Sequence, residues 1–193
     1  IDFLGKDIEV RAEAGPLATT IRGDGQSSVV RFAGGETPAC VLDGFTIENG
    51  AAPEGGGILC LSASPRIMNS IVRANAAFLR GGGILLQSST AALLGCRIEG
   101  NQSLGDGGGI ASTVGSNPQV KNCVISGNQA QSSGGGVFVT SARIVIEDSE
   151  IESNVAVFGS GGGASLVDSV LTAIRGTRIV SNTASSGGGV AKM

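Results

Sequence analysis

Residues 81–110 read GGGILLQSSTAALLGCRIEGNQSLGDGGGI and contain one complete copy of the unit that decides the fold. A glycine triplet opens this stretch, a second triplet closes it, and short apolar runs alternate with polar turns between them. The same triplet begins at Gly55, Gly81, Gly107, Gly134, Gly161 and Gly187. This near-constant interval of about 26 residues is typical of the repeating unit of a solenoid protein.

A second series of equivalent residues has the same period. Each member is an asparagine that lies three positions after an aliphatic residue and five to seven positions before a triplet. The series comprises Asn75, Asn101, Asn128, Asn154 and Asn182. Side-chain amides stacked about 4.8 Å apart satisfy one another's donors and acceptors. We therefore predict a structural ladder at an inner corner rather than a ligand site.

Between the triplets the apolar residues alternate as they do in short β-strands. One aliphatic position recurs in every copy, at Leu42, Ile67, Leu93, Val120, Ile146 and Ile174. Shortly after it comes a residue that tolerates a left-handed backbone, at Gly44, Asn69, Gly95, Asn122, Asp148 and Gly176. Each unit is thus predicted to contain strand, bend, strand, Asn corner, polar loop, triplet and strand.

These patterns predict an all-β chain that folds as a parallel β-helix solenoid of about seven coils, with about 26 residues in each coil. We expect a single domain over residues 1–193, with less regular starting coils at 1–39 and regular repeats at 40–193. The alternative is a leucine-rich repeat, because Leu93-x-x-Cys96-x-Ile98-x-x-Asn101 matches its core pattern. The triplets disfavour the helix that this alternative needs, since each Gly costs a helix about 1 kcal/mol.

The repeats resemble those of the right-handed parallel β-helix superfamily that includes pectate lyases, and especially those of bacterial polymorphic outer-membrane proteins and autotransporter adhesins. Those repeats carry Gly-Gly-Ala-Ile and Phe-x-x-Asn. The matching segments here are Gly-Gly-Gly-Ile at 81–84 and 107–110, and Ile98-x-x-Asn101. The resemblance covers about residues 40–193. It implies a non-enzymatic structural or adhesive stalk, extracellular or at the cell surface of a bacterium, with a protein or a polysaccharide as its partner.

The amino-acid composition excludes some kinds of catalytic side chain and disfavours some classes of partner. The chain has no His, Trp or Tyr and a net charge of -3, so imidazole and phenol chemistry are excluded. Its scattered Lys and Arg form no basic stripe for nucleic acid, and no apolar run approaches the ~20 residues of a membrane helix. We expect no cofactor, because Cys40, Cys60, Cys96 and Cys123 form no CxxC pair for zinc. Parallel side chains favour free thiols at Cys96 and Cys123 over a disulfide, but the sequence leaves their pairing open.

Charged residues alternate in sign at the outward positions of successive copies, which indicates exposed ion-pair columns worth ~0–1 kcal/mol per pair. The densest cluster contains Glu147, Glu150, Glu152, Arg175 and Arg178. These residues are the catalytic candidates under the alternative hypothesis of a carbohydrate-active enzyme, a polysaccharide lyase or hydrolase, in which carboxylates hold Ca²⁺ and a basic residue abstracts a sugar proton. A cation beside each carboxylate disfavours a calcium site, so we expect no metal.

Two further features concern partners. If Ile58 and Cys60 face inward, one sheet presents an outward apolar patch that consists of Leu59, Leu61, Leu85, Phe138 and Val167, which we predict to be a binding surface. The sequence ends at Met193, shortly after a triplet and without a capping element. Because solenoids need caps, we expect either a longer β-helix or end-to-end self-association.

Overall fold

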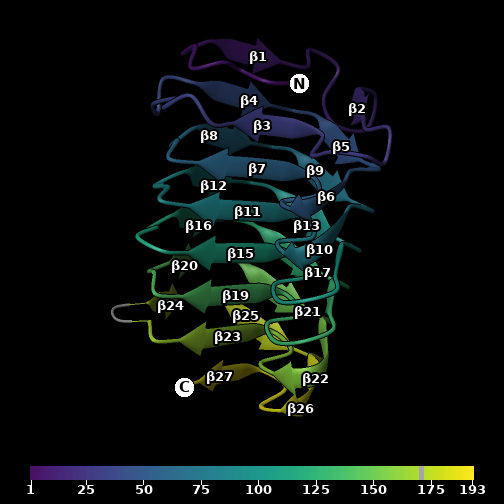
Figure 1. The fold of residues 1–193 in the computed structure, drawn as a ribbon, viewed down its shortest axis with the longest axis vertical. Coiled ribbons are helices and arrows are strands. Elements are labelled where there is room, and N and C mark those ends of the chain that lie inside the picture. The colour runs from purple at the N-terminus through teal and green to yellow at the C-terminus, as the bar shows by residue number, and fades with distance from the viewer. Residues whose placement is uncertain (170–171) are drawn as a thin grey trace.

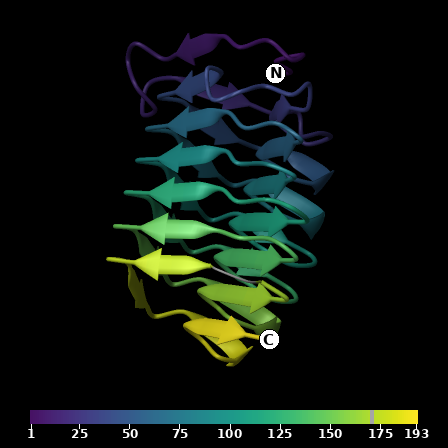
Figure 2. The same ribbon diagram turned by 90° about the vertical axis from the view of Figure 1, so that its left-hand side faces the viewer.

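The computed structural model describes residues 1–169 and 172–193. All secondary-structure elements assigned in these residues are β-strands. The strands stack as the coils of a parallel solenoid, which Figure 1 shows from the side and Figure 2 shows after a quarter turn. The predicted all-β parallel β-helix of about seven coils is confirmed. The leucine-rich alternative is wrong, because strands and turns form the return half of each coil in the described residues.

Four parallel sheets run along the solenoid. Sheet 1 contains β1 (Glu9–Arg11), β4 (Val41–Asp43), β8 (Arg66–Met68), β12 (Ala92–Leu94), β16 (Gln119–Lys121), β20 (Val145–Glu147) and β24 (Ala173–Arg175). Sheet 2 contains β2 (Thr20–Arg22), β5 (Thr46–Glu48), β9 (Ile71–Arg73), β13 (Arg97–Glu99), β17 (Val124–Ser126), β21 (Glu150–Glu152) and β25 (Arg178–Val180).

The chain then passes through sheets 3 and 4 before it returns to sheet 1. Sheet 3 contains β6 (Ala51–Glu54), β10 (Ala76–Arg80), β14 (Gln102–Ser103), β18 (Gln129–Ala130), β22 (Val155–Ser160) and β26 (Thr183–Ser186). Sheet 4 contains β3 (Val30–Phe32), β7 (Ile58–Leu61), β11 (Ile84–Gln87), β15 (Ile110–Thr113), β19 (Val137–Thr140), β23 (Ala164–Val167) and β27 (Val190–Lys192).

The core is formed by columns of inward side chains that run along the axis. In sheet 1, Leu93 lies between Ile67 and Val120 in the strand register, and all three are fully buried. Ile98 of sheet 2 and Ile84 of sheet 4 belong to the same hydrophobic cluster. Since a fully buried aliphatic side chain contributes about 1.5–3 kcal/mol, the repetition of these columns in each coil holds the stack together.

The bend between sheets 1 and 2 has a left-handed backbone in six successive coils. The φ angles lie between 45° and 82°, at Gly44, Asn69, Gly95, Asn122, Asp148 and Gly176. This part of the prediction is confirmed. Side chains behind the bend link neighbouring coils, because the backbone N–H of Cys123 donates to Oγ of Ser149 at 3.1 Å.

The glycine triplet is where the chain reverses between sheets 3 and 4. Gly81 has a φ of 68°, which favours glycine. A Cβ atom on Gly82 would collide with the carbonyl oxygen of Gln102 in the next coil. One on Gly83 would lie 2.6 Å from the carbonyl oxygen of Gly109. The triplet recurs because the backbones of adjacent coils approach too closely for side chains.

The segment between each Asn corner and its triplet is predicted as a polar loop, and that prediction is wrong. This segment forms the strands of sheet 3. Its second residue is small and buried in five coils, at Ala52, Ala77, Ser103, Ala130 and Ala156. Small inward side chains let this strand lie close to the rest of the coil, whereas the outward residues include both polar side chains, such as Gln102, and exposed apolar ones, such as Phe78.

No helix in residues 1–169 or 172–193 is long and apolar enough to cross a membrane.

Candidate ligand-binding site

The asparagines of the corner form a hydrogen-bonded series along the axis. Nδ2 of Asn101 donates to Oδ1 of Asn128, and Nδ2 of Asn128 donates to Oδ1 of Asn154, each at 3.0 Å. Asn75 and Asn182 continue the series at 3.1 and 2.9 Å. Each Nδ2 of these five also donates to a strand carbonyl of the preceding coil. These side chains are therefore engaged within the protein and are poorly placed to contact a ligand.

The predicted catalytic cluster is divided between two sheets. Glu147 lies on β20 of sheet 1, where Nζ of Lys121 is 3.6 Å and Nη1 of Arg175 is 3.8 Å from its carboxylate oxygens. On sheet 2, Arg178 of β25 pairs with both Glu150 and Glu152 of β21, the latter at 3.6 Å. Each carboxylate thus faces a cation of an adjacent coil. Among the described residues, no group of three or more Asp, Glu, Cys or His side chains gathers as a metal site.

The predicted outward patch on sheet 4 needs correction at two of its residues. Leu85 and Phe138 face outward as predicted, but they are only 0% and 7% exposed, so neither offers a surface to a partner. Leu59, Leu61 and Val167 are half-buried. The patch is therefore discontinuous, and its accessible part lies at its two ends.

The return of the chain explains why the middle of the patch is covered. The first glycine of a triplet lies over the outward residue four positions later in the same coil. A Cβ atom on Gly134 would be 2.8 Å from Cβ of Phe138, and one on Gly107 would be 3.0 Å from Cβ of Ala111. Because the triplet packs over this face, an outward direction does not bring exposure.

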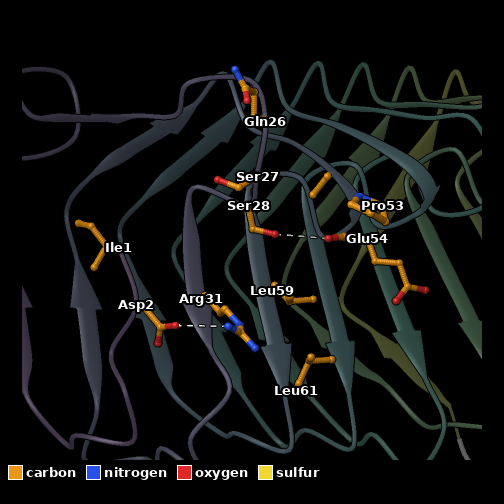
Figure 3. Close-up of a pocket in the computed structure, with 11 residues that line it drawn as sticks. Ile1, Asp2, Gln26, Ser27, Ser28, Arg31, Pro53, Glu54, Leu59 and Leu61 are labelled. Atoms are coloured by element: carbon orange, nitrogen blue, oxygen red, sulfur yellow. Dashed lines mark hydrogen bonds and ion pairs between the residues drawn. The ribbon is translucent and has the colours of Figure 1, made fainter.

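The accessible end near the N-terminus forms a pocket with a volume of about 520 Å³, drawn in Figure 3. Leu59 and Leu61 of β7 project into it from sheet 4 (Figure 3). Ala52 and Pro53 of β6 line the side that sheet 3 provides. These four side chains give the pocket an apolar floor at the junction of two sheets.

Polar groups form the rim of this pocket. Arg31 of β3 pairs with Asp2, with Nη1 and Oδ2 3.5 Å apart. Ser28 donates through Oγ to the carbonyl oxygen of Glu54 at 3.4 Å, and Figure 3 shows both interactions among the residues that line the pocket. Gln26 and Ser27 complete the lining on this side. An apolar floor with a few polar groups around it is the usual composition of a small-ligand site.

A comparison with protein families gives one result. A family model described as the right handed beta helix region matches residues 18–190. The chain belongs to this family. No curated protein and no solved structure matches this β-helix. Membership of this family shows the architecture, but a fold does not by itself determine a function, which depends on the residues of the site.

Sequence reasoning identifies Leu59 and Leu61 of this β-helix but misses the other residues of the pocket. Pro53 and Glu54 lie in the segment predicted as a loop, and Ser28 and Arg31 lie in the less regular start of the chain. One available signal is the position of Arg31, which comes about one repeat before Leu59 and lies opposite it in the register. The lower regularity of the first coils hides that alignment.

All four cysteines of the β-helix are free and buried. Burial raises the pKa of the Cys60 thiol, and the carboxylate of Glu36 adds to this effect. The backbone N–H of Cys96 donates to Sγ of Cys123 at 3.4 Å. The side-chain hydrogen bond to Cys123, together with burial, raises the pKa of the Cys96 thiol. The Cys60 and Cys96 thiols fill the core and are protonated at neutral pH.

Proposed function

We propose that this β-helix is a rigid, non-enzymatic scaffold, extracellular or at the surface of a bacterium, that binds a polysaccharide in the pocket between β6 and β7. The observation that carries the proposal is the apolar floor of Leu59, Leu61 and Pro53 with a polar rim. Such a floor suits the C–H faces of sugar rings, while Ser28 and Arg31 on the rim suit hydroxyl groups. The four sheets that surround the core make the support of this pocket stiff.

A non-enzymatic role is favoured by the electrostatics of the acidic cluster. A lyase needs carboxylates that are free to hold a metal, and a basic group that is free to take a proton. Glu147, Glu150 and Glu152 each lie beside a cation instead, and Arg178 is shared by two carboxylates. The enzyme remains the alternative hypothesis, with its site on this face of sheets 1 and 2.

Calorimetric titration with short oligosaccharides, accompanied by product analysis, tests the proposal. We expect binding that Leu61→Glu weakens, because the new carboxylate would enter the apolar floor. Thr140→Glu is the matched control, since Thr140 of β19 occupies the same column three coils away. Unsaturated uronate products that disappear in a Glu150→Gln, Arg178→Ala double variant would instead support the lyase. Equal affinity of the Leu61→Glu and Thr140→Glu variants would contradict the pocket.

A further inference from the structure

Sheet 3 carries exposed apolar side chains that do not belong to the lining of the pocket. The described residues include all six phenylalanines of the chain, and four of them, Phe3, Phe32, Phe45 and Phe138, are buried. Phe78 of β10 and Phe158 of β22 are 61% and 79% exposed. Both exposed aromatic rings thus lie on one sheet, where water alone does not favour them.

These rings belong to a band of exposed apolar residues on and beside the sheet-3 strands, which we call the sheet-3 ridge and which contains Pro53, Phe78, Leu79, Leu104 and Phe158. The backbone N–H of Leu104 donates to the carbonyl oxygen of Ala77 at 3.0 Å, which places Leu104 beside Phe78. The N–H of Phe158 donates to the carbonyl oxygen of Gln131 at 2.9 Å, which places Phe158 one position farther along its strand, opposite Ser132. The ridge therefore crosses the strands from β6 to β22, along the right-hand side of Figure 1.

The ridge follows the solenoid axis over two neighbouring columns of residues, because Phe78 and Leu104 share a column whereas Phe158 lies one position farther along its strand. Adjacent strands of a sheet lie about 4.8 Å apart, so the four steps from β6 to β22 span about 19 Å. Gln131 lies next to Leu104, just after β18, and the residue opposite it on β22 is Val157. Gln131 and Ser132 therefore separate Phe158 from Phe78 and Leu104, and no broad apolar area of the kind found at the core of a protein interface is formed.

The surroundings of the ridge are almost uncharged. Glu54 and Arg80 are the charged residues within the sheet-3 strands, and they pair with each other at 3.5 Å. The neighbouring outward residues are amides and hydroxyls, at Gln102, Gln129, Gln131, Thr183 and Ser185. A surface of this composition has no unpaired cation to attract an anionic polymer or an anionic membrane.

We propose that the sheet-3 ridge binds an uncharged polysaccharide chain that lies along the solenoid axis. The rings of Phe78 and Phe158 stack on the C–H faces of sugar units, and the glutamine amides exchange hydrogen bonds with hydroxyl groups. This inference rests on the proposed function and deepens it, because Pro53 belongs both to the ridge and to the pocket. One chain end enters the pocket while the following sugar units lie on the ridge.

Affinity electrophoresis in native gels tests the ridge. The probes are a soluble mixed-linkage β-glucan, a galactomannan and, as a charged comparison, polygalacturonate. We expect one of the two uncharged polymers to retard the protein. The Phe78→Ser, Phe158→Ser double variant is expected to bind that polymer about tenfold more weakly, since each aromatic contact contributes a factor of a few. Val114→Ser is the matched control, because Val114 is 60% exposed and lies outside sheet 3.

Phe78→Trp provides a second measurement, because a larger ring is expected to strengthen retardation without loss of fold. The ridge is overturned if neither uncharged polymer retards the protein, if only polygalacturonate does, or if the double variant and Val114→Ser bind equally. It is also overturned if light scattering shows a wild-type dimer that the double variant dissociates, since the ridge would then be a protein interface. Short oligosaccharides separate the two proposals. If Leu61→Glu leaves their binding intact while the double variant still loses the polymer, the pocket fails and the ridge stands.

Discussion

The replacement Asn128→Leu removes one member of the asparagine series and leaves a buried donor without a partner. Oδ1 of Asn128 accepts from both the backbone N–H and Nδ2 of Asn101, each at 3.0 Å. Nδ2 of Asn101 keeps its second acceptor, the carbonyl oxygen of Val72, but the N–H of Asn101 loses its side-chain acceptor. An unsatisfied buried donor costs about 1–3 kcal/mol. We therefore expect the free energy of unfolding to fall by about 1–3 kcal/mol.

Urea denaturation followed by circular dichroism measures this loss as a shift of the midpoint at constant slope. Gln131→Leu is the control, because Gln131 is half-buried on sheet 3 and the replacement introduces the same side chain. We expect Gln131→Leu to change stability by less than about 0.5 kcal/mol. If Asn128→Leu proved no more destabilising than this control, the amide series would not hold the coils together and the reasoning would be refuted.

Three other expectations follow from the structure. Gly83→Ala should destabilise the fold more than Gly100→Ala. The new Cβ atom at position 83 would lie 2.6 Å from a backbone oxygen, whereas at position 100 it would meet no atom within 4 Å and only the positive φ disfavours alanine. The denaturant midpoints of the two variants measure the difference. Stability should fall as pH rises above 9.0, the ordinary thiol value, because burial raises the pKa of Cys60 in the folded state and the unfolded chain releases its proton first. The slope is up to about 1.4 kcal/mol per pH unit, and Cys60→Ala should flatten it in denaturation curves at several pH values. Glu150→Gln should cost less than about 1 kcal/mol in thermal unfolding, since its partner Arg178 is largely exposed.

The repeat could be predicted because each column of the core is visible in the sequence at a spacing of one repeat. Leu93 and Val120 align in the sequence by that spacing, and they lie opposite each other in the register. The bend at Gly95 could be predicted for the same reason, because a left-handed residue recurs there in every copy. Local pattern and stacking of coils agree at these positions, so periodicity alone is sufficient.

Only part of the candidate site could be predicted. The exposure of an outward side chain depends on how neighbouring segments pack over it, and the alternation of residues within one strand does not show that packing. Alternation gives the direction of Leu85 and Phe138 relative to their own strands, but both are buried, and the first glycine of the triplet packs against each of them. The sequence favours a loop over residues 76–80, because they join a polar corner to a glycine triplet, and this hides the exposure of Phe78 on a strand. If the sequence had indicated a third strand before the triplet, the predicted binding surface would have been placed on sheet 3 rather than on sheet 4.

Hydrogen–deuterium exchange with and without a saturating uncharged polysaccharide tests the central claim most directly, because it locates the ligand on the molecule. The proposed scaffold predicts slower exchange at outward residues of β6, β7 and β10 and at residues 155–160, with no change in sheets 1 and 2. It also predicts that the polysaccharide keeps its length during the experiment. Protection confined to β20, β21, β24 and β25, together with shortening of the polymer, would contradict the account and place an active site at Glu147, Glu150 and Arg178.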